Sequence, residues 1–330
     1  MQEMNVPEEL KWARSLAGKH PDLFGGQDGG TLKLDEPQAS SHATRVYGIN
    51  GGGIHIKYFG RALGRTNVTY EPRHEMETEY RTLREFEKNG FSSGRYRIVR
   101  PLGFNEKLDC ALATVYVGGE TLLSLIYGAI NGEKRESDLL NALDMTAGLL
   151  KRIHTAMPQS SRADGAGMFY SYLKSVFYLE EQGMMDGFHR RVMRGMSRWY
   201  NHRPLFEQPG VTVHGDANPS NFKIDGDVIY GFDVERSHQD GSPLLDLGTM
   251  AAELKHHFSY LTGKADNASP YVERFLEAYA PDDEGQKHLA GMLPFFESRG
   301  FFKIAMLGYW KRDYKKYLVE LGTRRIEEKP

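Results

Sequence analysis

The chain has little cysteine and almost no net charge, and these two features limit the classes of protein to which it can belong. It holds one cysteine, Cys110, in 330 residues, so a disulfide framework is excluded. Cys110 stands in an apolar run, where a small buried side chain is the expected role. The formal net charge is −2 and the basic residues are spread along the chain, which argues against a nucleic-acid-binding protein.

Long apolar runs are missing as well. No stretch approaches the roughly 20 apolar residues of a membrane-spanning helix. The N-terminus also lacks a basic start followed by an apolar core, so we expect no signal peptide, no membrane partner and a cytoplasmic location. Hydrophobic residues make up 40% and charged residues 26%, as in a globular protein of one or two domains.

The order of apolar patterns and turn residues predicts an α+β protein. Its first part should hold a short helix at 7–18, strands at 31–35, 45–50, 53–59, 96–101 and 111–117, and a helix at 73–89. Beyond Gly118-Gly119 we expect short strands at 211–213 and 228–232, and helices at 137–157 (capped by Ser137), 170–181, 188–200, 244–262, 270–279 and 287–320. This pattern predicts a helix and linker at 1–30, a β-rich lobe at 31–117 and a helical lobe at 118–330, with a hinge near 114–118.

The most informative segment is Val211–Phe222, with a companion at Gly231–Arg236. Asp216 follows an apolar run and a glycine, Asn221 comes five residues later, and Asp233 follows a second apolar run. An aspartate in a tight loop after a strand suits a catalytic base. Asn221 and Asp233 supply oxygen atoms, which Mg²⁺ prefers together with water and phosphate oxygens. Phosphoryl transfer needs these parts: alignment, neutralised charge and a proton acceptor.

Each of these residues alone also fits an ordinary surface turn, which is rich in Asp, Asn, Pro, Ser and Gly. The combination, with a strand on both sides, favours a functional site.

The segment His214-Gly-Asp-Ala-Asn-Pro-Ser-Asn221, with Phe232-Asp233, resembles the aminoglycoside phosphotransferase and choline kinase-like superfamily. It is also similar to the catalytic and metal-binding motifs of protein kinases. The resemblance implies a two-lobed protein kinase-like fold, with a small antiparallel β-sheet lobe and a large helical lobe. It makes Asp216 the catalytic base, and Asn221 and Asp233 the metal ligands. Leu244–Gly248 matches a later family motif.

The same resemblance implies supporting roles for further residues. Asp246 would hold the backbone of the catalytic loop, and His214 would be a structural hydrogen-bonding residue. Glu235 resembles an acidic residue of choline kinase-like members; its role stays open beside that of a solvated side chain.

The nucleotide-binding residues also follow from the resemblance. Lys57, among apolar strand residues, would contact the phosphates, with Glu79 as its partner and Glu75 as the second candidate. Alternating lysine and apolar residues also suit a solvent-facing strand position. Thr114 and Tyr116 align with positions that bind adenine through backbone atoms.

Two glycine-rich phosphate motifs, Gly-x-Gly-x-x-Gly and Gly-x-x-x-x-Gly-Lys-[Ser/Thr], are absent from the sequence. The loop 36–44 stands in their place, as is common in small-molecule kinases of this superfamily. Ser40 and Ser41 could offer donors to phosphate there. The Gly51–Gly53 cluster indicates a hairpin turn.

The acceptor pocket should lie in the helical lobe, but the sequence leaves its chemistry open. Glu253 and His257 share a helix face. Adjacent His256 and His257 should point apart, which disfavours a metal pair. The aromatic residues after 294 are typical of core packing: Phe295, Phe296, Phe301, Phe302, Tyr309 and Trp310.

The sequence thus predicts an ATP- and Mg²⁺-dependent phosphotransferase that phosphorylates a hydroxyl of a small molecule such as an amino alcohol, an aminoglycoside or a sugar. A catalytically silent nucleotide- or ligand-binding module of the same fold is the alternative. A metal-dependent phosphohydrolase is disfavoured because its clustered His and Asp motifs are missing. A protein kinase is disfavoured by the missing glycine loop and the missing Ala-Pro-Glu. The oligomeric state and the choice between ATP and GTP stay open.

Overall fold

The structure is a computed structural model that describes residues 6–24, 33–35, 42–49, 52–62 and 70–329. The chain divides into two compact units, residues 1–119 with 230–235, and residues 120–229 with 236–330. Within the described residues, no helix combines the length and the apolar character needed to cross a bilayer.

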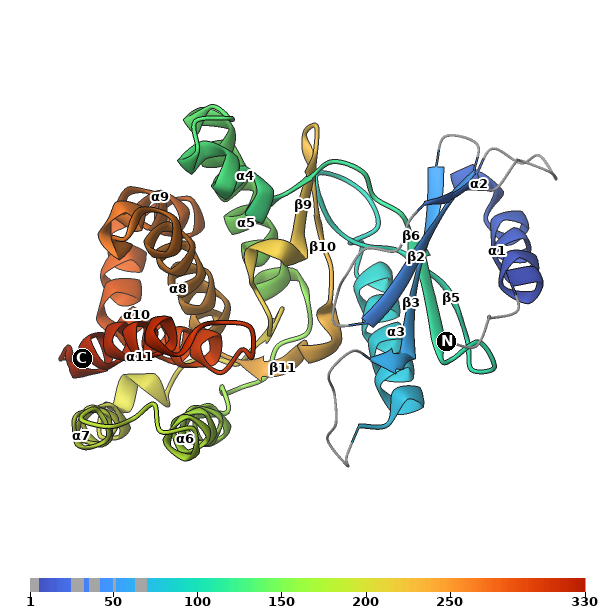
Figure 1. Cartoon of the computed structure of the whole chain (residues 1–330). Helices are drawn as coiled ribbons and strands as arrows, with labels where there is room; N and C mark the ends of the chain where they lie inside the picture. The colour runs from blue at the N-terminus through green and yellow to red at the C-terminus, as the bar shows by residue number, and fades with distance from the viewer. Residues whose placement is uncertain (1–5, 25–32, 36–41, 50–51, 63–69, 330) are drawn as a thin grey trace. The chain divides into compact units, whose positions relative to one another are not determined.

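The first unit is built on an antiparallel sheet in the strand order β1-β2-β3-β6-β5 (Figure 1). Its elements are α1 (Val6–Lys19), α2 (Pro21–Phe24), β1 (Lys33–Asp35), β2 (His42–Ile49), β3 (Gly52–Ala62), α3 (Pro72–Lys88), β4 (Tyr96–Ile98), β5 (Pro101–Asn105) and β6 (Ala111–Val115).

Helices cover both faces of this sheet. Alternate residues of β3, including Ile54 and Ile56, are buried against apolar residues of α1 such as Leu16. Strand β3 is central, and α3 packs on the sheet with its apolar stripe, which includes Met76 and Leu83. The helix expected in a separate segment 1–30 therefore belongs to the core of this unit. The lysine of β3 is consequently buried, although lysine is rarely found in a core.

The second unit is mainly helical, with short strands beside the predicted motif (Figure 1). Its helices are α4 (Leu122–Ile130), α5 (Glu136–Ala156), α6 (Gly165–Glu181), α7 (His189–Tyr200), α8 (Pro243–Thr262), α9 (Ser269–Tyr279), α10 (Asp283–Ala305) and α11 (Arg312–Glu327). Its strands are β7 (Glu120–Thr121), β8 (Val211–Val213), β9 (Phe222–Asp225), β10 (Val228–Gly231, whose end belongs to the first unit) and β11 (His238–Gly241). Short 3₁₀ turns lie at Arg203–Leu205, Pro219–Asn221, Val234–Arg236 and Ala265–Ala268.

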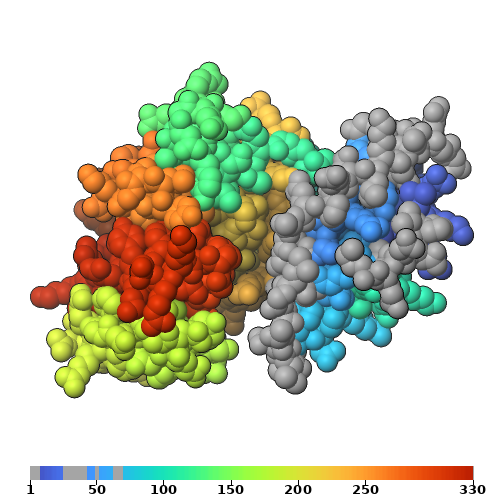
Figure 2. Space-filling model, in the orientation of Figure 1, coloured from blue at the N-terminus to red at the C-terminus, as the bar shows by residue number. Residues whose placement is uncertain are grey.

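The core of the second unit forms where α10 packs on α8 and α11, with α5 against α9. Phe295, Phe296, Phe301 and Phe302 are buried there, as expected. The same expectation was wrong for Tyr309, which is exposed, and Trp310 is only half-buried, because both residues follow the end of α10. Figure 2 shows α11 (red) at the surface beside the α6–α7 region (yellow-green), in line with the packing of α11 on α7.

Several local predictions were wrong. The expected strand at 96–101 is two strands, β4 and β5, and the expected helix at 287–320 is two helices, α10 and α11. Ser137 does not cap α5, which begins at Glu136 after Arg135 without a side-chain cap. Helix α4 and strands β7, β9 and β11 were missed because they are short or follow glycine-rich breaks.

Cys110 is also placed differently from the expectation. It is half-buried, and its φ of +51° places it in the turn before β6. The apolar run around Cys110 predicted a buried side chain, but the strand begins only at the next residue, Ala111.

Candidate active site

The loop after β8 carries the predicted base. Strand β8 is fully buried, and the chain turns at Gly215, whose φ is +81°. A Cβ atom at Gly215 would lie 2.3 Å from the carbonyl oxygen of Arg236. Only glycine fits this turn, both for its backbone conformation and for the close approach of a second chain segment. The sharp turn leaves the side chain of Asp216 one-quarter exposed.

Asp246 anchors this loop from the first turn of α8. It accepts hydrogen bonds from the backbone N–H groups of His214 (2.7 Å, Oδ2) and Gly215 (2.9 Å, Oδ1). Ser242 caps α8 and Pro243 occupies its first turn, which fixes where Asp246 points. The carboxylate is fully buried, so its negative charge depends on these donors.

A histidine that sequence reasoning missed completes the anchor. His154 of α5 lies 3.0 Å from Asp246 through Nε2 and 2.8 Å from the Tyr279 hydroxyl through Nδ1. Burial opposes the charged form of Asp246, but the hydrogen bond from His154 and those from the loop outweigh it, so the pKa of Asp246 is lowered. His154 ends an apolar stripe in the sequence, and no motif marked it.

Asn221 braces the loop internally. Its Nδ2 donates to the carbonyl oxygen of Asp216 at 2.9 Å, which turns the other end of the amide, Oδ1, away from that contact. The Ser220 hydroxyl lies 3.5 Å from this oxygen. His214 is buried beside Phe222, and its Nδ1 faces the N–H of Asp216 at 3.4 Å. The loop is therefore held at both ends and across its middle.

Lys303 of α10 contacts the carboxylate of Asp216 directly. Burial would raise the pKa of Asp216, but the Lys303 ammonium ion, with a smaller effect of Arg236, lowers it below its ordinary value. Asp216 is therefore ionised at neutral pH. Sequence reasoning missed Lys303 because it lies 87 residues away on a helix whose pattern indicated only core packing.

In the first unit, Lys57 gathers three carboxylates. Its Nζ lies 2.8 Å from Glu79, 2.9 Å from Asp233 and 3.4 Å from Glu235. Burial disfavours the charged lysine, yet Glu79 and then Asp233 outweigh it, so the pKa of Lys57 is raised. Burial, together with Asp233 and Glu235, raises the pKa of Glu79 despite Lys57. The helix partner of Lys57 is Glu79; Glu75 lies one turn earlier, in the first turn of α3.

Asp233 has an unusual backbone. Its φ is +51°, a left-handed conformation that aspartate tolerates better than most residues. Its side chain is 46% exposed, whereas that of Glu235 is 14% exposed. A sparsely populated conformation beside a buried ion pair is typical of functional sites.

Of the other predicted nucleotide contacts, Thr114 and Tyr116 lie within the described residues. Thr114 is buried in β6, where it pairs with His55, and the backbone N–H of Tyr116 donates to the Gly53 carbonyl at 2.7 Å. That amide is thus already used in this structure. Ser40 and Ser41 lie outside the described residues.

The histidine pair on α8 corrects an expectation. The rings of His256 and His257 do not diverge; their centroids are 4.5 Å apart, and their nitrogens lie with a Glu253 oxygen within 4.8 Å of one another. Tyr314 and Tyr127 draw the rings together by contacting Nδ1 of His256 (2.9 Å) and of His257 (3.2 Å). Burial, then His257, lowers the pKa of His256 to about 3.

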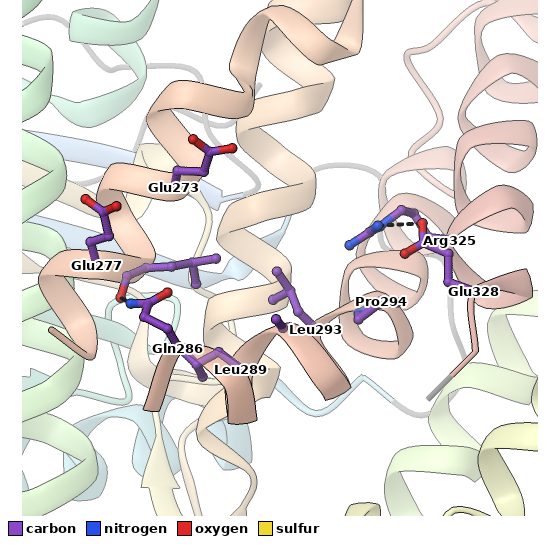
Figure 3. A pocket seen from close by; sticks show the side chains of 10 residues that line it. Glu273, Glu277, Gln286, Leu289, Leu293, Pro294, Arg325 and Glu328 are labelled. Carbon is purple, nitrogen blue, oxygen red and sulfur yellow. Dashed lines mark hydrogen bonds and ion pairs between the residues drawn. The ribbon is translucent and has the colours of Figure 1, made fainter. Parts of the chain in front are cut away.

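A separate hollow of about 360 Å³ lies between α9, α10 and α11. Figure 3 shows Glu273 and Glu277 of α9 on one side and Arg325 and Glu328 on the other. None of the predicted site residues lines it, so it takes no part in the chemistry of Asp216 or Lys57.

Known proteins resemble this chain in sequence and in fold. A family model described as "Phosphotransferase enzyme family" matches residues 59–289. A search of curated proteins returned no match.

Solved structures match over nearly the whole chain. An aminoglycoside phosphotransferase, APH(2'')-IIa, in a ternary complex with streptomycin and ATP, is 14% identical with a TM-score of 0.58, covering 97% of both chains. A protein described as a fructosamine-3-kinase from Thermobifida fusca is 16% identical with a TM-score of 0.59, covering 95% of this chain and 98% of its own.

A choline/ethanolamine kinase family protein from Mesorhizobium loti is 15% identical with a TM-score of 0.55, covering 96% of this chain and 99% of its own. At this identity the likeness shows the fold, and the predicted two-lobed, protein kinase-like α+β fold is confirmed.

Proposed function

Because the chain belongs to the phosphotransferase enzyme family, we propose that it transfers the γ-phosphate of ATP to a hydroxyl group of a small molecule. The observation that carries this proposal is the anchored Asp216. Its loop is fixed by Asp246 and Asn221, its carboxylate is ionised, and its side chain is partly exposed. A positioned, ionised carboxylate open to solvent is what a hydroxyl acceptor requires.

In the proposed reaction, Asp216 accepts a hydrogen bond from the acceptor hydroxyl and orients its oxygen toward the γ-phosphorus. The new O–P bond forms as the bond between the γ-phosphorus and the β,γ-bridging oxygen breaks, and ADP leaves with that electron pair. The hydroxyl proton passes to Asp216. Because the pKa of Asp216 is low, it orients the hydroxyl first and takes the proton late, as the oxygen becomes acidic.

The first unit would handle the nucleotide. Lys57 would contact the phosphates, and Glu79 holds its ammonium group at 2.8 Å. The resemblance assigns adenine contacts to Thr114 and Tyr116. The structure of APH(2'')-IIa with streptomycin and ATP supports ATP as the donor.

The donor atoms available fit Mg²⁺. Asp233 offers an exposed carboxylate, and Asn221 offers its amide oxygen because its NH₂ group is already engaged. Both are hard oxygen ligands of the kind that Mg²⁺ prefers. When bound, the ion would neutralise charge on the phosphates.

The test is a nucleotide-consumption screen over amino alcohols, aminoglycosides, sugars and sugar acids, with Asp216→Asn as the blank. We expect this variant to lose on the order of 10²–10⁴-fold in turnover while nucleotide binding survives. Asp225→Asn, at the exposed end of β9 in the same unit, is the matched control and should keep full activity.

Unchanged turnover of Asp216→Asn would contradict the assignment of the base. ATP binding without turnover on any acceptor class would favour the alternative, a silent nucleotide-binding module.

A further inference from the structure

The surroundings of Asp216 carry an excess of positive charge. Lys303 contacts its carboxylate, and Arg236 lies near enough to lower its pKa further. Arg299 stands four residues before Lys303 on α10, so both side chains share one face of that helix. Three cations thus meet one candidate base.

Within the described residues, the two arginines have few direct polar partners. In the part of the chain that the structure describes, neither Arg299 nor Arg236 forms an ion pair with a carboxylate. Arg299 donates a hydrogen bond of 3.1 Å to the Ser171 hydroxyl, and its Nε is buried without a partner among the described groups. Asp246 is no substitute, because backbone N–H groups and His154 already occupy its oxygens.

This arrangement costs stability. Burial, and then the like charge of Arg236, lower the pKa of Arg299 to about 10, so the guanidinium stays charged at neutral pH while facing a second cation. The charges of Asp216 and Asp246 offset part of this effect, but a charge withdrawn from water without a directly paired counterion is destabilising. A fold keeps such a group most readily where a bound anion completes it.

Resting on the proposed function, we propose that the phosphate acceptor is an anionic hydroxy compound. Its carboxylate or phosphate ester is bound by Arg299, with Arg236 and Lys303 alongside, and its hydroxyl faces Asp216. Arginine suits this role because its planar fork donates two parallel hydrogen bonds to an oxyanion. A cationic amine at the same place would meet three like charges.

Lys303 then has two partners in turn. In the free protein it is held by Asp216. When the anionic group arrives, the ammonium can turn to it and release the carboxylate for the acceptor hydroxyl. Binding of the correct acceptor thereby exposes the base.

The experiment compares anionic, neutral and cationic acceptors on two scaffolds, in which the charged group replaces one hydroxyl or hydroxymethyl position of the neutral member. The first set is glucuronate, glucose and glucosamine; the second is glycerate, glycerol and 3-amino-1,2-propanediol, with glycerol 3-phosphate to separate phosphate from carboxylate. ADP formation is measured for each. We expect kcat/KM for an anionic member to exceed that of its neutral and cationic counterparts at least tenfold.

Arg299→Met then tests the residue. We expect KM for the anionic acceptor to rise tenfold or more, with KM for ATP unchanged and Tm unchanged or higher, because the substitution removes an unpaired cation. Lys287→Met, an exposed cation on α10, should change nothing. A rise in KM for ATP instead would show that the cations serve the nucleotide and would overturn the proposal.

The panel also separates the two proposals. Phosphorylation of a neutral or amine member in preference to its acid would refute the anionic acceptor and leave the kinase standing. ATP binding with no ADP formed on any scaffold would count against the kinase. In that case, calorimetric titration of glucuronate and glycerate into wild type and Arg299→Met still tests the anion site. We expect at least one of the two acids to bind wild type more tightly than it binds Arg299→Met. Equal affinity of both acids for the two proteins would refute the anion site.

Discussion

Replacing Asp246 by Asn tests whether the loop that carries Asp216, the proposed base, is held in place by α8. Asp246 accepts three hydrogen bonds, from the N–H of His214, the N–H of Gly215 and Nε2 of His154. Asn keeps one acceptor oxygen of the two. If that oxygen keeps the position of Oδ2, the new NH₂ group faces the N–H of Gly215, donor against donor.

The cost follows from these contacts. One charge-assisted hydrogen bond is lost, worth about 1.5–3 kcal/mol, and buried donors stay unsatisfied at about 1–3 kcal/mol. The sum, about 2.5–6 kcal/mol, brackets the usual cost of removing one partner of a buried charge pair, about 3–5 kcal/mol. It is a large share of a typical stability of about 5–15 kcal/mol.

Urea unfolding followed by tryptophan fluorescence measures this change, because Trp199 and Trp310 lie in the second unit. Asp225→Asn is the control and should shift the free energy of unfolding by less than about 0.5 kcal/mol. Turnover of Asp246→Asn should fall with little change in KM for ATP, since the loop moves and the Lys57 cluster does not. A loss of stability below about 1 kcal/mol would refute the anchoring role.

Three further predictions follow from the contacts above. Lys303→Met removes the charge that lowers the pKa of Asp216, so burial should raise that pKa and move the acid limb of the kcat/KM profile to higher pH; an unmoved limb would show that Lys303 does not act on the base. Gly215→Ala should destabilise the protein more than Gly263→Ala. Both glycines have positive φ, which costs an alanine about 1–2 kcal/mol, but only at Gly215 would the added Cβ lie 2.3 Å from a carbonyl oxygen. Equal losses of stability in thermal unfolding would show that the loop can shift to accommodate the Cβ atom. Glu79→Gln should reduce kcat/KM for ATP on the order of 10–100-fold through loss of a charged hydrogen bond, whereas Glu75→Gln should not; similar effects of both would refute the assigned partner of Lys57.

The sequence predicted the structure correctly where residues with characteristic chemistry stand in a characteristic local pattern of strand and turn residues. The strand, glycine and aspartate around Asp216 predicted a strand end and a tight turn, and both are present. The α+β class and most long elements followed from hydrophobic periodicity, because burial of one face imposes a period on the letters.

The remainder depends on contacts between distant segments. His154, Lys303 and Arg299 lie on helices whose patterns indicate only packing, and their roles arise when α5 and α10 meet the loop after β8. The converging rings of His256 and His257 depend likewise on tyrosines from two other helices. The spacing of residues within one segment cannot predict contacts between segments that are distant in the sequence.

The assignment of residues 230–235 to the first unit bears on how this protein is made. The strands of the sheet are synthesised first, but Asp233 and Glu235, which pair with the buried Lys57, follow 114 and 116 residues after Gly119, where the first segment of that unit ends (233 − 119 and 235 − 119). Translation must therefore pass Glu235 before the ion-pair cluster around Lys57 can be completed. Until then Lys57 has Glu79 as its sole carboxylate from the described part of the nascent sheet unit, and a fragment ending at residue 119 would keep that immature state permanently.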